Sequence, residues 1–554
     1  MKNIDKLIAN LTNEEKIALV SGHNFMYTNS VSRLGIPSIR MSDGPHGLRV
    51  QNEGGDNGVT GSLPATAFPT ASCSANTFNP TLLEKMGKAM GLEAKYYGID
   101  MILGPGVCIK RNPLCGRNFE YFSEDPFLTG RMGAAEVKGI QSTGTGSCVK
   151  HYALNNSENY RFMGNSVCDM RAMREIYLKQ YEYIVKESHP EAIMSAYNQI
   201  NGTFCSENKW LLTDVLRNEW GFDGVVMTDW GGTKDRVLSI KAGNDLEMPG
   251  DTDICRKWLL DAINDGSLDI KDLDAMVRNI LVMVQNHENK EKLESINWEE
   301  HHELAKEIAL EGAVLLKNEN MLPLNNEEEL LVVGELFEKM RFQGAGSSMI
   351  NPYLYISPKD AFENNGIKYK YFNSKNVIID RDGYLKLVPF HIRRILGNKN
   401  NNNKNILEKN KNEYSPPEIF LENNEQNTET ADWWNLGIII YEMAYGIPPF
   451  YSDNDNEMKN IIINIELKFP KNSKISENLK DLIKKLLNKN YKERLGYNGF
   501  EEIKNHQFFK DFNFNDLLEK KIKPLYKPII GDILEGNKTI NKKYNFEDLQ
   551  KIKL

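Results

Sequence analysis

The sequence lacks several features that would assign it to a membrane or to a secreted protein. No stretch of about 18 apolar residues occurs, so no membrane-spanning helix is expected. The residues after Met1 are acidic and polar where a signal peptide needs an apolar run, which predicts a cytoplasmic protein. The seven cysteines form no CxxC pair and no zinc spacing, so we expect reduced thiols and no metal site.

An excess of positive charge is also missing. The formal net charge is −8, which gives no reason to expect nucleic acid or an anionic membrane as a partner. With 40% hydrophobic and 26% charged residues, the composition is that of an ordinary soluble protein. A chain of 554 residues is too long for one hydrophobic core, so several domains are expected.

The composition changes along the chain. All seven cysteines lie at or before Cys255, and after Phe372 only two alanines remain, Ala431 and Ala444. Asparagine, lysine and isoleucine become frequent there, and residues 400–403 are all asparagine. We interpret this change as a sign that the two halves have different origins. A linker between two domains is the alternative interpretation.

The first half of the chain, residues 1–290, alternates short apolar strands with segments of helical spacing. A strand is expected at 99–103, and helices are expected at 172–187 and 206–220. This alternation predicts parallel strands with helical crossovers, and the length suits a (β/α)8 TIM barrel of the α/β class. Polar residues follow five apolar strands, where barrel enzymes carry their catalytic groups, and these residues are Asp43, His151, Tyr197, Asp229 and Glu247.

Six separated motifs also occur in this half. They lie at 42–49 (SDGPHGLR), 104–107 (GPGV), 112–120 (NPLCGRNFE), 149–152 (VKHY), 195–198 (SAYN) and 228–230 (TDW). Their residues and their order resemble glycoside hydrolase family 3, the β-glucosidase group, over about residues 5–372. The resemblance implies a retaining hydrolase of terminal β-D-glucosyl residues that acts on a β-glucoside or an oligosaccharide and needs no cofactor.

The resemblance implies roles for particular residues. Asp229 takes the place of the nucleophile, and the ring of Trp230 would form an apolar wall for one face of the sugar. Tyr197 is expected to orient Asp229. The residues whose positions correspond to contacts with the sugar are Asp43, Arg117, Lys150, His151, Arg161 and Tyr197.

These assignments have structural alternatives. The carboxylate of Asp229 could instead cap the N-terminus of a helix. Lys150 could belong to a structural ion pair, and His151 could be a hydrogen-bonded residue of the core. Glu247 is interpreted as a structural residue of the barrel mouth, and contact with a substrate is the less favoured alternative.

The stretch after the barrel is predicted to contain a linker at 291–304 and a truncated second α/β sandwich domain at 305–372. A strand is expected at 330–334, and the motif at 341–348 (RFQGAGSS) resembles a family loop that reaches over the barrel mouth. In the family this second domain also supplies the acid/base glutamate, further along the chain than the resemblance extends. The acid/base is therefore predicted to be absent and hydrolysis to be impaired. Glu442 lies at a suitable separation from Asp229 but is interpreted as a structural helix residue.

A different set of motifs follows, at 414–418 (YSPPE), 432–437 (DWWNLG) and 493–496 (ERLG). They resemble the C-lobe of an AGC protein kinase, so residues 373–554 are predicted to be a partial, mainly α-helical lobe with an asparagine-rich insert at 397–413. Asn376 matches a metal-ligand position, although a turn residue is the simpler interpretation. The residues that match bracing positions of such a lobe are Glu418, Asp432 and Arg494.

This second half lacks the parts that phosphoryl transfer needs. The glycine-rich loop, the strand lysine and the helix glutamate of the small lobe are missing. The metal-binding motif Asp-Phe-Gly is replaced by Pro389-Phe390-His391, and a proline cannot bind magnesium. ATP binding and kinase activity are therefore not expected. Three hypotheses remain: an impaired glycosidase, a pseudokinase interaction module, and a chimera without function.

Overall fold

A computed structural model describes most of the chain. Two compact units are present, one formed by Met1–Glu319 with Arg341–Tyr355 and the other by Asn320–Met340 with Ile356–Leu554. Asn376 and the predicted insert at 397–413 lie outside the described residues. The structure describes all residues except 1–2, 52–60, 251–252, 289–291, 320–321, 325–329, 373–376, 380–384, 388–413, 422–427, 446, 453, 471–474 and 524–554.

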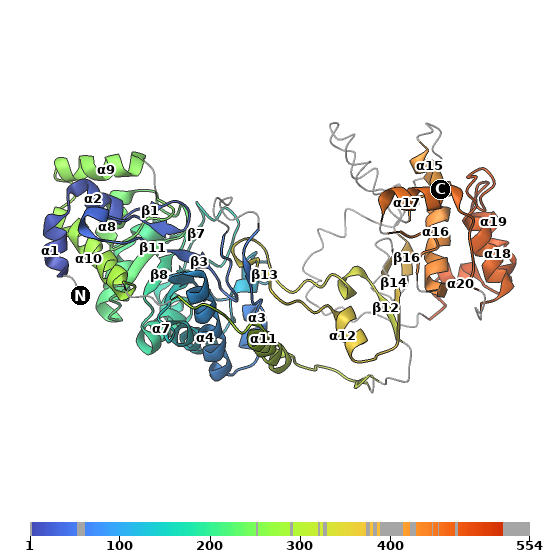
Figure 1. The fold of residues 1–554 in the computed structure, drawn as a ribbon, viewed down its shortest axis with the longest axis horizontal. Coiled ribbons are helices and arrows are strands. Elements are labelled where there is room, and N and C mark those ends of the chain that lie inside the picture. The colour runs from blue at the N-terminus through green and yellow to red at the C-terminus, as the bar shows by residue number, and fades with distance from the viewer. Residues whose placement is uncertain are drawn as a thin grey trace. The chain divides into compact units, whose positions relative to one another are not determined.

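The first unit is built on a five-stranded parallel sheet (Figure 1). Its strands, in spatial order, are β11 (Val225–Thr228), β8 (Ala192–Ser195), β6 (Gly146–Tyr152), β5 (Met101–Leu103) and β3 (Met41–Asp43). Every residue of these strands is buried, as in a parallel sheet covered on both faces. The predicted parallel strands are therefore present.

Isolated backbone bridges extend this sheet beyond β11. Met227 forms a parallel bridge with Leu246, and Glu247 forms one with Ser21. Glu247 donates its N–H to the carbonyl of Val20 at 3.0 Å, which continues the same ladder. The stretch around residues 246–247 therefore takes the place of a sixth strand.

An antiparallel hairpin completes the ring. It consists of β1 (Gly22–His23) and β2 (Tyr27–Thr28), and Tyr27 forms an antiparallel bridge with Arg40, directly before β3. The sheet thus closes on itself as a barrel, but it closes through a hairpin and not through further regular parallel strands. The barrel was predicted from the strand–helix alternation, whereas the hairpin was not.

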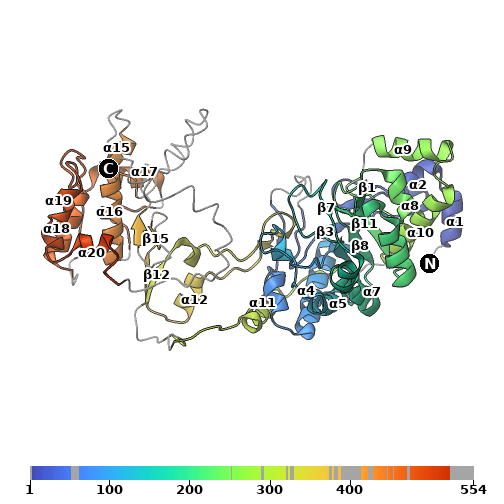
Figure 2. The same cartoon turned by 180° about the vertical axis from the view of Figure 1, so that it is seen from behind.

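Helices connect the strands of the first unit and surround its sheet (Figures 1 and 2). Side-chain oxygens of Asn79 and Asp125 cap α4 and α5, each followed by a proline in the first turn. The helices described in this unit are α1 (Ile4–Asn10), α2 (Asn13–Leu19), α3 (Ala71–Ala75), α4 (Pro80–Tyr97), α5 (Pro126–Gln141), α6 (Met170–Ala172), α7 (Lys179–Ser188), α8 (Arg236–Ala242), α9 (Asp253–Asn264), α10 (Ile270–Asn286) and α11 (Trp298–Gly312), with π-helical segments at Met173–Tyr177 and Trp210–Glu219.

Two glycines let α4 and α5 pack closely. A Cβ atom at Gly87 would lie 2.2 Å from the carbonyl oxygen of Glu136, and a Cβ atom at Gly139 would lie 2.1 Å from that of Glu84. Both distances are far below van der Waals contact, so neither position accommodates alanine without a shift of the helices.

Short strands add smaller sheets to the first unit. The strands β7 (Asn165–Ser166), β9 (Gln199–Ile200) and β10 (Thr203–Phe204) form one sheet in the loops after β6 and β8. In a second pair, β13 (Asn351–Pro352) lies parallel to β4 (Pro64–Ala65), which ties the segment around residues 341–355 to this unit.

The predicted linker at 291–304 contains the beginning of α11. Trp298 stacks on Tyr353 with ring centroids 4.7 Å apart, and the Nδ1 atom of His301 lies 2.7 Å from a carboxylate oxygen of Glu93. The later part of the predicted linker is therefore a helix that packs on the first unit.

The second unit begins with a parallel pair of strands, β12 (Leu330–Val333) and β14 (Tyr369–Phe372), joined through α12 (Pro358–Asn364). The strand predicted at 330–334 is thus present. A further antiparallel pair consists of β15 (Val377–Ile379) and β16 (Leu385–Leu387).

The remainder of the second unit is mainly helical. Trp434 is fully buried and stacks on Phe450 with ring centroids 5.6 Å apart, and both belong to one hydrophobic cluster. None of the helices in the described ranges is long and apolar enough to cross a bilayer. The described helices are α15 (Pro417–Phe420), α16 (Thr428–Tyr445), α17 (Asp455–Asn464), α18 (Glu477–Leu486), α19 (Phe500–Lys504) and α20 (Phe514–Leu518).

Candidate active site

Predicted site residues gather at the carboxyl ends of the barrel strands. Asp43 ends β3, Lys150 and His151 lie near the end of β6, and Asp229 directly follows β11. All four are buried, with exposed fractions between 1% and 9%. The adjacent strands of the parallel sheet bring together residues that are far apart in the sequence.

Asp229 is held by its backbone and by neighbouring polar groups. Its N–H donates to the carbonyl of Ser195 on β8 at 3.0 Å, and its Oδ1 accepts the N–H of Trp230 at 2.8 Å. The other oxygen, Oδ2, lies 3.5 Å from Nη1 of Arg117 and 3.4 Å from Nε2 of His151. The carboxylate therefore has a fixed orientation beside a positive charge.

His151 lies between Arg117 and Tyr121. Its Nε2 is 2.7 Å from Nη2 of Arg117, and its Nδ1 is 3.0 Å from the hydroxyl of Tyr121. Arginine can only donate, so Nε2 accepts and the single ring hydrogen resides on Nδ1. Burial and the charges of Arg117 and Lys150 hold the pKa of His151 well below its usual value, which agrees with this neutral form.

Glu120 is a buried partner of Arg117. Its side chain is fully inaccessible, and one carboxylate oxygen accepts a hydrogen bond from Nε of Arg117. Burial alone would raise the pKa of Glu120, but Arg117 and Lys150 hold it below its usual value. Glu120 thus fixes the guanidinium whose other nitrogens face His151 and Asp229.

Asp43 and Lys150 form a second charged pair. The ammonium of Lys150 lies 3.6 Å from Oδ1 of Asp43, and the lysine is 2% exposed. Burial raises the pKa of Asp43, and the charge of Lys150 opposes this rise. A buried carboxylate beside an ammonium suits the binding of sugar hydroxyl groups, which both donate and accept hydrogen bonds.

Tyr197, Arg161 and Trp230 surround this centre. The Cζ atom of Arg161 lies 4.7 Å from the ring centroid of Tyr197, and burial together with the charge of Asp229 raises the pKa of Tyr197. Trp230 donates its indole N–H to the carbonyl of Phe25 at 2.8 Å, which fixes the plane of its ring.

The predicted glycine-rich loop contains one close backbone approach. A Cβ atom at Gly344 would lie 2.4 Å from a ring carbon of Phe119, next to Glu120. The loop therefore lies against the segment that carries Arg117 and Glu120.

Two residues of the centre, Glu120 and Tyr121, were missed by sequence reasoning. Glu120 belongs to the quoted motif at 112–120, and Tyr121 follows it directly. Nothing in the neighbouring residues Asn118 and Phe119 indicates that Glu120 is completely buried. Among the described residues, no group of three or more histidine, cysteine, aspartate or glutamate side chains is arranged to hold a metal ion.

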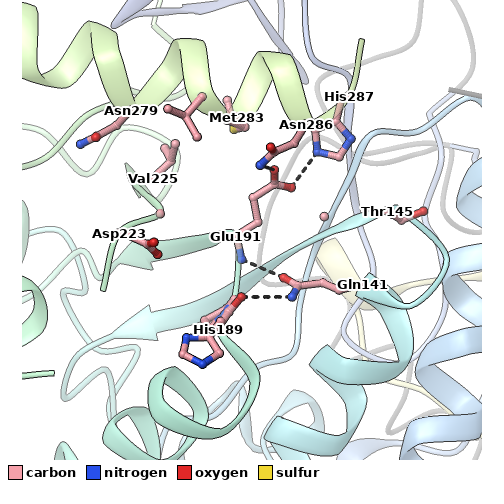
Figure 3. A pocket seen from close by; sticks show the side chains of 15 residues that line it. Gln141, Thr145, His189, Glu191, Asp223, Val225, Asn279, Met283, Asn286 and His287 are labelled. Atoms are coloured by element: carbon pink, nitrogen blue, oxygen red, sulfur yellow. Dashed lines mark hydrogen bonds and ion pairs between the residues drawn. The ribbon is translucent and has the colours of Figure 1, made fainter. Parts of the chain in front are cut away.

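A cavity of about 320 Å³ lies at the other end of the barrel, where β6, β8 and β11 begin (Figure 3). Glu191 spans it, with its carboxylate 2.7 Å from Nε2 of His287 and 3.0 Å from Nδ2 of Asn286. None of the predicted site residues lines this cavity. Because barrel enzymes act at the carboxyl ends of their strands, the cluster around Asp229 is the candidate active site.

The second unit contains the other predicted residues. Arg494 donates to both carboxylate oxygens of Glu418, at 2.7 Å and 2.9 Å, and is 1% exposed. Asp432 lies near the start of α16. Glu442 is buried and accepts a hydrogen bond from the hydroxyl of Tyr414 at 2.7 Å. This contact gives Glu442 a partner within its own unit.

The closed barrel and its buried strand-end cluster define a (β/α)8-type barrel with a candidate active site. Residues 8–283 match the glycosyl hydrolase family 3 N-terminal domain. Residues 361–509 match the protein kinase domain. The chain therefore combines a glycoside hydrolase family 3 domain with a region similar to protein kinases.

Similar proteins are glycosidases. Thermostable beta-glucosidase B of Acetivibrio thermocellus is 46% identical over 388 residues, which cover 69% of this chain and 51% of that protein. An exo-alpha-(1->6)-L-arabinopyranosidase of Bifidobacterium longum is 42% identical over 376 residues, covering 65% and 49%. Beta-glucosidase 3B of Thermotoga neapolitana, solved with alpha-D-glucose, superposes with a TM-score of 0.63 at 39% identity, covering 66% and 55%. The chain spans about half the length of these relatives.

Proposed function

We propose that the barrel performs the first step of a retaining β-glucosidase with Asp229 as the nucleophile. The observation that carries this proposal is the buried carboxylate of Asp229, held at the end of β11 beside Arg117 and His151. The β-glucosidase relatives support a glycoside as the substrate. Retaining glycosidases need such a carboxylate to form a covalent glycosyl-enzyme.

The proposed reaction begins with attack of the Asp229 carboxylate on the anomeric carbon. The bond from that carbon to the leaving oxygen breaks, and its electron pair stays on the oxygen. Asp43 and Lys150 bind sugar hydroxyls, and the Arg117–His151 pair holds the nucleophile in place. Water then attacks the anomeric carbon, the bond from this carbon to Asp229 breaks and restores the carboxylate, and the proton of the water passes to the solvent as the sugar leaves.

We further propose that hydrolysis of ordinary glucosides is slow, because the resemblance to the family ends before the acid/base glutamate that its second domain supplies. Two carboxyl groups near Asp229 are already engaged, Glu120 with Arg117 and Asp43 with Lys150. Glu442 is bound to Tyr414 in the second unit. A leaving group of low basicity departs without a proton, so such substrates should still glycosylate Asp229.

Covalent labelling tests this function. The protein is incubated with a 2-fluoro-glucoside that carries an activated leaving group, and the labelled peptide is identified by mass spectrometry. We expect a label on Asp229 that is absent in Asp229→Asn. A folded protein that gains no label, or is labelled at another residue, would contradict the proposal. The same experiment with an α-L-arabinopyranoside probe tests the second substrate class found among the relatives.

A second proposal concerns the kinase-like region, which would act as an interaction module without phosphoryl transfer. The bidentate pair of Arg494 and Glu418 is a bracing contact within this region. Isothermal titration with Mg²⁺-ATP should give no saturable binding. Saturable binding of ATP would contradict this proposal.

A further inference from the structure

The cavity at the amino ends of the barrel strands contains acidic side chains and no basic ones. Glu191 directly precedes β8 and spans the cavity, and Asp223 lines it two residues before β11 (Figure 3). Among the described residues that line it, none is a lysine or an arginine. Its volume of about 320 Å³ lies at the lower end of the range for small-molecule pockets, so it suits a small ligand.

Several helices of the first unit end at this cavity, and the C-terminus of a helix carries a partial negative charge. The helices α5 and α10 end at Gln141 and Asn286, both of which line the cavity. The helix α7 ends at Ser188, directly before the lining residue His189. The last turn of α10 contains no basic residue that would offset this charge. Backbone and side chains therefore both make the cavity attractive to a cation.

The imidazole of His287 lines the cavity and contacts Glu191. Its Nε2 lies 2.7 Å from the carboxylate, whereas its Nδ1 is buried and has no hydrogen-bond partner among the described residues. An imidazolium would leave a buried N–H at Nδ1 unsatisfied, which is unfavourable. The hydrogen bonds therefore favour a neutral ring that donates from Nε2, so His287 does not neutralise the charge of Glu191.

Glu191 has a fixed position and retains capacity to accept hydrogen bonds. Its Oε1 accepts from Nδ2 of Asn286 at 3.0 Å, and its backbone N–H donates to the side-chain oxygen of Gln141 at 2.8 Å. A Cβ atom at Gly146 would lie 2.1 Å from Oε2, so the glycine makes room for the carboxylate. Each carboxylate oxygen has two lone pairs, and each accepts one described hydrogen bond, so both can accept another.

We propose that this cavity binds a small aliphatic diammonium compound, with one ammonium group at Glu191 and the other at Asp223. An ammonium group carries a positive charge and only donors, which complements the carboxylates and the free acceptor sites of the cavity. Val225 and Met283 also line the cavity and suit the methylene chain between the two charges (Figure 3). In the described part of the chain, no group of acidic, histidine or cysteine side chains is arranged for a metal ion. The site lies at the opposite end of the barrel from Asp229 and does not depend on the proposed reaction.

Isothermal titration of the full chain with 1,4-diaminobutane at pH 7 tests the proposal. We expect saturable binding with a dissociation constant below about 1 mM. The neutral analogue 1,4-butanediol, which has the same chain length, should not bind. Asp223→Asn, at an exposed position, should weaken the binding of the diamine at least about tenfold and leave the unfolding temperature unchanged. Glu191→Gln should weaken the binding by a similar factor.

Asp214→Asn is the matched control, because Asp214 is an exposed aspartate of the same unit that does not line the cavity. It should retain the wild-type affinity for the diamine. The proposal is wrong if the wild-type protein shows no saturable binding, if the diol binds as well as the diamine, or if either Asp223→Asn or Glu191→Gln keeps the wild-type affinity. A heat signal that KCl reproduces at the same ionic strength would indicate nonspecific screening and would also overturn the proposal.

Discussion

Arg117 donates a hydrogen bond to Nε2 of His151 at 2.7 Å, and this contact determines the tautomer of the imidazole. The guanidinium has no acceptor, so Nε2 carries no hydrogen and Nδ1–H points to the hydroxyl of Tyr121. The neutral imidazole of His151 therefore connects the guanidinium of Arg117 to the hydroxyl of Tyr121 through two hydrogen bonds. Glu120 holds the other side of the same guanidinium, so the orientation of Arg117 beside Asp229 depends on both partners.

Tyr121→Phe removes the acceptor of the His151 Nδ1–H and leaves the ring in place. We expect slower labelling of Asp229, by about tenfold to a hundredfold, because Arg117 loses a fixed neighbour. The buried N–H without a partner should also lower the unfolding free energy by about 1–3 kcal/mol. Tyr183→Phe, on α7, is the control. Unchanged labelling in Tyr121→Phe would show that the tyrosine does not position the site.

Glu120→Gln removes the nearer of the two carboxylates beside the buried Arg117. Removing one member of a buried ion pair costs about 3–5 kcal/mol, so the first unit should unfold at a clearly lower urea concentration. The exposed pair of Arg171 and Glu175 provides the comparison, since Glu175→Gln should change stability by less than about 0.5 kcal/mol. Equal effects of the two substitutions would contradict the role of Glu120.

The stability of the first unit should fall as the pH decreases from about 6.5 to about 4. His46 is 1% exposed, both of its ring nitrogens lack a hydrogen-bond partner among the described residues, and burial lowers its pKa to about 4. The unfolded chain binds a proton at a pKa of about 6.5. The contribution of neutral His46 to the unfolding free energy is therefore complete above pH 6.5 and decreases as the pH falls toward 4.

Urea unfolding at pH 7, 6, 5 and 4 measures this dependence. His46→Gln should reduce the loss of stability over that range by up to about 3 kcal/mol. His23→Gln, at an exposed position, should leave the pH dependence of the unfolding free energy unchanged. An unchanged pH dependence in His46→Gln would rule out His46 as its origin.

Glu418→Gln tests whether the two units are energetically separate. The substitution breaks the bidentate pair with the buried Arg494 and should destabilise the second unit by about 3 kcal/mol. Labelling of Asp229 should keep its wild-type rate, because no described contact of Glu418 belongs to the barrel. A reduced labelling rate in Glu418→Gln would show that the two units depend on each other.

Part of the fold could be predicted because it is encoded locally. The apolar run before Asp229 forms β11, and the expected strand at 330–334 forms β12. The hairpin that closes the barrel was not predicted, because its strands are only two residues each and their pairing with Arg40 is a contact across the chain. A helix was expected from His302 to Asn318, and α11 begins slightly earlier, at Trp298, which packs against the distant Tyr353.

By itself, the sequence determined which residues end the barrel strands, because the apolar runs and the residues that follow them are local patterns. The protonation of His151 and the burial of Glu120 were decided only by the tertiary structure. Arg117 and Tyr121 lie 34 and 30 residues from His151 and reach it only when the ends of the strands meet. A tautomer or a pKa depends on the atoms around the group, and in a parallel barrel those atoms come from separate loops.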